Sequence, residues 1–133
     1  MLSAEEARRR IRSRLQEQRL LVETLLRLRE QLQGSLFARY GVCGKETCVC
    51  RQGRKHGPYY VLSSRSGGRG TFSYLKGRQA EAARELVGRH RAFKEGLRRL
   101  RRVNEQLVDQ LRRYQESMAQ RGEAQLGIAP PAQ

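Results

Sequence analysis

The fold depends first on one short stretch near the middle of the chain, CGKETCVCRQGRKH, which runs from Cys43 to His56. It contains all three cysteines of the chain and one of its two histidines. Thiolates and an imidazole are ligands that zinc prefers, and four of them at short spacings can surround one tetrahedral ion. The sequence therefore predicts a zinc site with Cys43, Cys48, Cys50 and His56 as its ligands.

Two other interpretations of this stretch remain open, namely unligated thiols and a redox site. Cys48 and Cys50 are poorly spaced for a disulfide, and free thiols persist in a reducing compartment. A catalytic zinc would need an open coordination position and a general base, and Glu46 is the only carboxylate nearby. We therefore expect a structural metal and no enzymatic activity.

Segments typical of strands follow the cysteines. Residues 59–62 and 71–75 are rich in strand-forming side chains, and the loop between them contains Gly67, Gly68 and Gly70, so together they predict a β-hairpin. A short apolar segment, residues 36–40, precedes the cysteines. Because an isolated hairpin is only marginally stable in water, we expect the metal site to hold it.

A first helix is predicted over residues 3–33. Ser3 and Glu6 have the spacing of a capping box, and Gly34 is a natural residue to stop the helix. Its apolar residues recur at steps of three and four, with one gap at Gln18. They are Ala4, Ala7, Ile11, Leu15, Val22, Leu25, Leu28 and Leu32.

A second, more regular helix is predicted over residues 77–121, with Gly122 as its stop. Its heptad pattern runs through Ala83, Leu86, His90, Phe93, Leu97, Leu100, Asn104, Leu107, Leu111, Tyr114 and Met118. Asn104 either fixes the register of the seam or turns out to solvent. His90 is interpreted as a packed imidazole, with a ligand role as the alternative.

These segments predict a mainly α fold in one structural domain, in which two long antiparallel coiled-coil helices flank a Cys3His zinc-stabilised β-hairpin. The zinc module covers residues 34–76, and residues 122–133 form a disordered tail. Because the second helix is longer than the first, the apolar side chains of its far end stay partly uncovered: Leu107, Leu111, Tyr114 and Met118. We therefore expect a homodimer formed through the helices.

The charge is strongly positive, with 28 Lys and Arg against 13 Asp and Glu and a net charge of +15. The central segment, residues 34–76, is the most basic for its length, and Glu46 is its only acid. Such an excess favours a polyanionic partner; the alternative is a charge that only keeps the protein soluble. The candidate nucleic-acid-binding residues are Lys45, Arg51, Arg54, Lys55, Arg65, Arg69, Lys76, Arg98, Arg99, Arg101 and Arg102.

Two groups among these residues have alternative interpretations. The four helix arginines at 98–102 equally suit a solvated helix face. Tyr59, Tyr60 and Tyr74 could stack on bases, although a place in the hairpin core is the preferred interpretation. The chain has no apolar run long enough for a membrane span and no apolar N-terminal signal, so we expect a cytoplasmic protein.

The run Cys43-Gly44-Lys45, Cys48, Cys50, then His56-Gly57-Pro58-Tyr59-Tyr60, together with Leu62-Ser63 and Tyr74-Leu75, resembles a family of short prokaryotic proteins. That family is described as a domain of unknown function and is often labelled transposase-related. The resemblance covers about residues 34–95 and implies that the cysteines and His56 match the family's own positions. It implies no catalytic residues.

Taken together, these observations lead us to expect a zinc-dependent nucleic-acid-binding protein. DNA is favoured over RNA, and an association with mobile elements is expected, both only because of the resemblance. The alternative is an interaction or adaptor protein, in which the helices recruit a partner protein and the zinc knob is purely structural.

Overall fold

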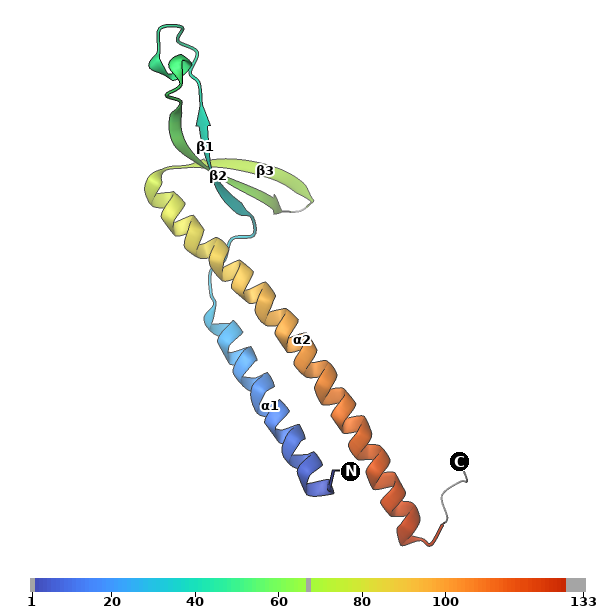
Figure 1. Cartoon of the computed structure of the whole chain (residues 1–133). Helices are drawn as coiled ribbons and strands as arrows, with labels where there is room; N and C mark the ends of the chain where they lie inside the picture. The colour runs from blue at the N-terminus through green and yellow to red at the C-terminus, as the bar shows by residue number, and fades with distance from the viewer. Residues whose placement is uncertain (1, 67, 129–133) are drawn as a thin grey trace. The chain divides into compact units, whose positions relative to one another are not determined.

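The structure of the chain is a computed structural model that describes residues 2–66 and 68–128. Along the chain it contains α1 (Ala4–Arg27), β1 (Ser35–Gly41), a 3-10 turn η1 (Val49–Gln52), β2 (His56–Ser66), β3 (Arg69–Leu75) and α2 (Gly77–Gln125) (Figure 1). Two compact units divide these elements. The helical unit comprises Met1–Arg27 and Glu95–Gln133, and the sheet unit comprises Leu28–Lys94, so α2 contributes to both.

The start of α1 follows from its first residues. The Glu6 backbone N–H donates to Ser3 Oγ at 3.2 Å, and the Ser3 N–H donates to Glu6 Oε2 at 3.2 Å. This is the expected capping box, which satisfies two backbone donors that a helix start leaves unpaired. Glu5 and Glu6 also place negative charge at the positive end of the helix dipole.

In the helical unit, α1 lies beside the C-terminal part of α2 (Figure 1). The two predicted polar interruptions, Gln18 and Asn104, meet each other. Gln18 Nε2 donates to Asn104 Oδ1 at 2.8 Å, so Asn104 lies in the seam rather than turned out to solvent. Near the start of α1, Arg8 Nε donates to the Tyr114 hydroxyl at 2.9 Å. The buried apolar side chains of the unit are Ile11, Leu25, Val103 and Leu107.

The prediction of two long coiled-coil helices flanking a hairpin is wrong, although the mainly α character holds. α1 has 24 residues and α2 has 49, and Leu97 and Leu111 of the predicted seam are exposed. Leu107, expected to be uncovered, is buried. The packing differs because Gly96 lies in the seam in place of Leu97: a Cβ at Gly96 would collide with the Leu25 side chain.

The end of α1 at Arg27, rather than residue 33, has a tertiary cause. Leu28 and Leu32 continue the apolar pattern, but the segment after Arg27 is held in a non-helical path within the sheet unit. The Leu32 backbone N–H donates to the Leu86 carbonyl at 3.1 Å, and Arg89 Nη1 donates to the Glu30 carbonyl at 3.3 Å. These bonds replace the helical ones that the local sequence favours.

The predicted hairpin is the β2–β3 part of a three-stranded antiparallel sheet, in the order β1-β2-β3. The unpredicted strand β1 is the short apolar segment before the cysteines. It pairs with β2 in a register that sets Leu36 opposite Leu62 and Phe37 opposite Val61. At its start, Gly34 has φ +155° and a Cβ there would collide with the Ser63 carbonyl oxygen, so Gly34 begins the sheet instead of stopping a helix.

The two faces of the sheet differ in burial. On one face, Leu62 is buried and its neighbours Leu36, Tyr60 and Leu75 are half-buried. The first turns of α2 contribute further buried side chains to the core of the sheet unit: Ala80, Ala83 and Val87. The opposite face, described with the site below, exposes aromatic rings around the buried Val61.

The C-terminal segment departs from the expected tail at residues 122–133. Helix α2 continues through Gly122 to Gln125, and the predicted tail residues 129–133 lie outside the described residues. Among the helices of residues 2–66 and 68–128, none combines the length and the apolar character that crossing a membrane requires.

Candidate metal centre and nucleic-acid surface

The sheet closes the loop that carries the four predicted ligands. Gly41 at the end of β1 pairs with His56 at the start of β2, after a register shift at Arg39/Gly41, so both ends of the loop leave from one point. Inside the loop, the η1 turn begins after Cys48 and ends at Gly53, which has φ +107°. This left-handed turn suits glycine and directs the chain back toward His56.

The loop brings Cys43, Cys48, Cys50 and His56 together, with all four possible ligand atoms within 4.8 Å of one another. The sulfurs of Cys43 and Cys50 are 3.5 Å apart, and Cys48 Sγ lies 3.2 Å from His56 Nε2. In a tetrahedron with Zn–S bonds of about 2.3 Å, two ligand atoms are separated by about 3.8 Å. The cluster therefore has a suitable size for one metal ion, and its cysteines are free thiols rather than a disulfide.

The thiols of the cluster have different environments. A hydrogen bond from the Cys50 backbone, followed by side-chain hydrogen bonds from Cys43 and Cys50, lowers the pKa of the Cys48 thiol to about 7. Cys50 is only 2% exposed, and this burial raises the pKa of its thiol. Cys48 thus reaches the metal-binding thiolate form near neutral pH, whereas Cys50 gains most from a cation that offsets its burial.

Of the predicted nucleic-acid-binding residues, seven belong to the sheet unit, and all seven are exposed. Four lie in the loop between β1 and β2, which we call the metal loop, and one follows β3. They are Lys45, Arg51, Arg54, Lys55 and Lys76. Arg65 and Arg69 lie at the other end of β2, where β2 turns into β3. The 11 residues of β2 separate the loop from this turn by about 30 Å along the strand. The residues therefore form two basic groups, not one contiguous surface.

The four helix arginines, Arg98, Arg99, Arg101 and Arg102, belong to the helical unit and are exposed on α2. Arg98 pairs with Glu95 at 3.3 Å, on the same helix. Their exposure to solvent is compatible with both interpretations, nucleic-acid contact and a simple solvated helix face.

One face of the sheet exposes aromatic rings that sequence reasoning did not single out correctly. The register places Phe37, Val61 and Tyr74 in one row across the three strands, with Tyr59 and Phe72 on the same face. Phe72 is 69% exposed and Tyr74 65% exposed. We call these five residues the aromatic face. A strand alternation that places Val61 and Phe72 opposite to Leu62 and Leu75 was the signal that could have found it.

Tyrosines 59, 60 and 74 therefore do not share one role. Tyr59 and Tyr74 are exposed on the aromatic face, so the preferred interpretation of a hairpin core is wrong for them. Tyr60 points to the opposite face, which carries Leu62, and is half-buried.

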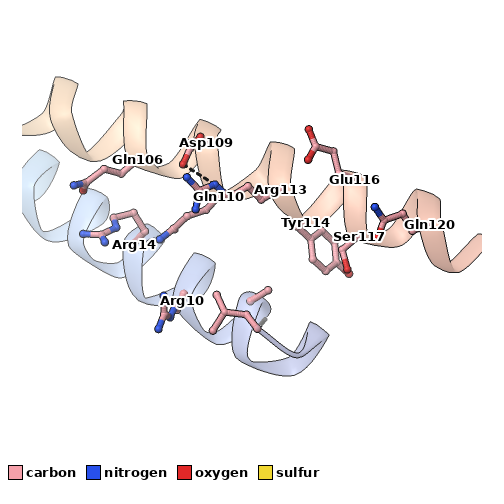
Figure 2. A pocket seen from close by; sticks show the side chains of 12 residues that line it. Arg10, Arg14, Gln106, Asp109, Gln110, Arg113, Tyr114, Glu116, Ser117 and Gln120 are labelled. Atoms are coloured by element: carbon pink, nitrogen blue, oxygen red, sulfur yellow. Dashed lines mark ion pairs between the residues drawn. The ribbon is translucent and has the colours of Figure 1, made fainter. Parts of the chain in front are cut away.

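The helical unit has a groove of about 540 Å³ between α1 and α2, which the sequence did not predict (Figure 2). Arg10 and Arg14 of α1 face Gln110 and Tyr114 of α2 across it. Arg14 Nε and Gln110 Oε1 are buried there without a hydrogen-bond partner among the described residues. The residues lining the groove include none of the four possible metal ligands, so groove and metal cluster are separate sites.

Comparison with known protein families shows which family the chain resembles. The model of a family described as a domain of unknown function, DUF6788, matches residues 4–85. The chain belongs to this family. The match includes α1, the whole sheet and all four residues of the metal cluster. No curated protein and no solved structure matches the chain.

Proposed function

We propose that this chain is a zinc-stabilised protein that binds nucleic acid through its sheet unit. The observation that carries the proposal is the charge of that unit. It contains 14 of the 28 Lys and Arg but only four of the 13 acids, a net charge of +10. Between residues 31 and 80 the only acid is Glu46. Phosphate groups are the partners that such a surface attracts most strongly.

The choice of zinc rests on the ligand chemistry and on the small core. Three sulfurs and one imidazole nitrogen form a donor set typical of a closed structural zinc site. The sheet unit buries few large side chains, with Val61, Leu62 and Val87 the largest of them. Small units of this kind need a further stabilising element, and zinc binding contributes on the order of 10–16 kcal/mol to folding in such modules.

The two histidines of the chain give a matched test of the metal. We expect one zinc per chain in metal-replete protein, and His56→Gln should reduce this well below one. His90→Gln should leave it unchanged, because His90 lies on α2 away from the cysteines. Cys48→Ser should unfold the sheet while much of the helicity remains. Elemental analysis that finds well under one zinc in the parent protein contradicts the proposal.

The nucleic-acid proposal predicts a steep salt dependence of binding. Each phosphate contact should add roughly −0.9 to the slope of log affinity against log salt on duplex DNA, and roughly −0.7 on a single strand. Replacing Arg65 and Arg69 together with alanine should weaken binding to all sequences and make the slope shallower by about two units on duplex DNA. Fluorescence anisotropy with labelled duplex and single-stranded oligonucleotides measures both quantities.

A matched control removes the same charge elsewhere. Arg19 and Arg113 are exposed and already paired, with Glu23 and Asp109, so replacing both with alanine should leave the slope nearly unchanged. Arg101→Ala with Arg102→Ala tests the helix face in the same assay. If replacing Arg65 and Arg69, or Arg101 and Arg102, changes neither the affinity nor the salt slope, the charge only keeps the protein soluble. The alternative, an adaptor for a partner protein, is then favoured. A parent protein that binds neither DNA nor RNA at low salt overturns the proposal.

DNA remains the preferred nucleic acid only through the resemblance described above, as does any link to mobile elements. The proposal places the protein in a reducing cytoplasm, where three free thiols persist long enough to take a metal.

A further inference from the structure

We infer that the aromatic face of the sheet binds an unpaired stretch of nucleic acid by stacking bases on Phe37, Tyr59, Phe72 and Tyr74. The inference rests on the proposed function and names the form of nucleic acid that the sheet unit would take. A basic surface alone binds any phosphate backbone, whereas exposed rings can stack only on bases that are free of a duplex.

The geometry of the face suits such stacking. Directly opposite side chains on neighbouring antiparallel strands are about 5 Å apart at Cβ, and alternate residues of one strand are about 7 Å apart. Phe37 and Tyr74 flank Val61 from the two outer strands, and Phe72 lies two residues before Tyr74 on β3. Val61, 3% exposed, forms the floor between the rings. The face is therefore a broad aromatic platform rather than a narrow cleft.

The electrostatics of this face indicate an anionic partner. Two arginines share the face with the rings, Arg39 opposite Tyr59 and Arg65 opposite Gly70. Arg39 Nη1 donates to the Tyr74 hydroxyl at 3.3 Å, which holds a guanidinium over the platform. None of the three strands contains an acid. Rings interleaved with arginines combine base stacking with phosphate contacts.

The position of the platform connects the two basic groups described above. β2 runs from the metal loop at His56 to the turn beyond Arg65, and the rings lie along and beside it. A path of about 30 Å suits several extended nucleotides, within the sites of about 4–16 nucleotides that single-strand-binding folds of similar size cover. One strand could therefore contact basic residues at both ends and stack in between.

Two other occupants fit this face less well. A second copy would bring its own strongly positive sheet unit against the first, because the unit carries a net charge of +10. An apolar protein partner would leave Arg39 and Arg65 without anions in the interface, which costs desolvation free energy. A nucleic acid meets both requirements, since it provides phosphates for the arginines and flat rings for the aromatic side chains.

The test uses paired variants of the zinc-loaded full chain. Phe72→Leu with Tyr74→Leu keeps the apolar surface but removes two rings, whereas Phe72→Tyr keeps both rings and the Tyr74 hydroxyl that accepts the Arg39 hydrogen bond. The probes are labelled thymidine and uridine oligomers, an abasic oligomer of the same length and a blunt duplex. Zinc content and circular dichroism establish that each variant is folded.

We expect the leucine pair to weaken binding of both base-containing single strands by about 30-fold or more, since each lost stacking contact costs about fivefold or more. Its duplex and abasic affinities and its salt slope should stay close to those of the parent, and Phe72→Tyr should bind like the parent. The difference between the thymidine and uridine oligomers shows whether DNA or RNA is the better ligand.

The possible failures are distinguishable. If the parent binds duplex, abasic and base-containing strands equally and the leucine pair changes nothing, the inference is wrong while the proposed function stands. If the parent binds no probe at low salt, both are wrong. If the leucine pair alters only the oligomeric state, the face is an interface between copies. If the leucine pair fails to fold, ring protons of Phe72 and Tyr74 in the parent must shift on adding the thymidine oligomer; unchanged shifts overturn the inference.

Discussion

Gly57 shows how a single backbone position supports the metal cluster. It directly follows His56, one of the four possible metal ligands, and adopts φ +137°. A Cβ at this position would lie 2.8 Å from the Arg39 carbonyl oxygen and 2.9 Å from the Tyr40 ring. Only glycine permits both this backbone conformation and the close approach of β1 to β2, so His56 depends on it for its place beside the cysteines.

Replacing Gly57 with alanine should therefore lower the free energy of unfolding by about 1–3 kcal/mol or more, because the new Cβ strains the backbone and pushes β1 away. Gly44→Ala, in the loop that precedes β2, is the matched control, since nothing lies within 4 Å of a Cβ at that position; we expect a change within about 0.5 kcal/mol. Urea denaturation of the zinc-loaded proteins measures both. Equal stabilities for the two variants would show that the approach of β1 does not depend on Gly57.

The helices show how packing overrides a regular apolar pattern. The sequence repeat passes through Leu97 and Leu111, but both are exposed, while Gly96 and Val103 face α1. A side chain at position 96 has no room, because the Leu25 side chain of α1 fills the space into which it would project. A short residue in the seam lets two helices approach closely, and this contact determines which side of α2 is buried.

Two glycine-to-alanine variants of α2 test this packing. Gly88→Ala should stabilise the protein by about 0.5–1 kcal/mol, because alanine favours helix and nothing lies within 4 Å of its Cβ. Gly96→Ala gains the same propensity but must displace the buried Leu25, and overpacking of this kind costs about 1–3 kcal/mol. Thermal unfolding monitored by helical circular dichroism should therefore rank Gly88→Ala above Gly96→Ala. The reverse order would contradict the close contact at Leu25.

At the scale of the molecule, the two units have separate buried cores, which predicts separate responses to metal removal. A chelator should unfold the sheet unit, since its proposed zinc site lies in the loop between β1 and β2. The helical unit should keep most of its helicity through Ile11, Leu25, Val103 and Leu107. Dispersed amide signals from the strands should disappear while the circular dichroism of the helices largely persists.

Adding zinc back should restore the strand signals, and magnesium should not, because thiolate and imidazole ligands favour the softer ion. Complete loss of helicity on chelation would show that the two units fold as one.

The expectation of a homodimer remains a prediction, now for a partly different set of side chains. Leu107 is buried, whereas Leu97, Val108 and Leu111 expose apolar surface on α2. Association would remove this surface from water, so we expect a dimer by light scattering at tens of micromolar. Leu97→Lys with Leu111→Lys should then give a monomer of unchanged helicity. A monomeric parent protein would rule out this association.

The sequence by itself determined the features that depend on residue type and short spacing. The cluster of three cysteines and His56, the capping box at Ser3 and the β2–β3 hairpin all follow from residues close together in the sequence, where local geometry decides the outcome. Net charge likewise does not depend on conformation, so the sequence alone shows that the central segment is basic.

Only the tertiary structure decided the features that depend on contacts between distant segments. α1 ends at Arg27 because bonds to Leu86 and Arg89 replace helical ones. The exposed rings Phe72 and Tyr74 share one face with Phe37 and the buried Val61 only because β1 pairs with β2 in the observed register. A pattern of apolar residues predicts that a surface will be buried, but the element that buries this surface depends on the packing of the whole chain.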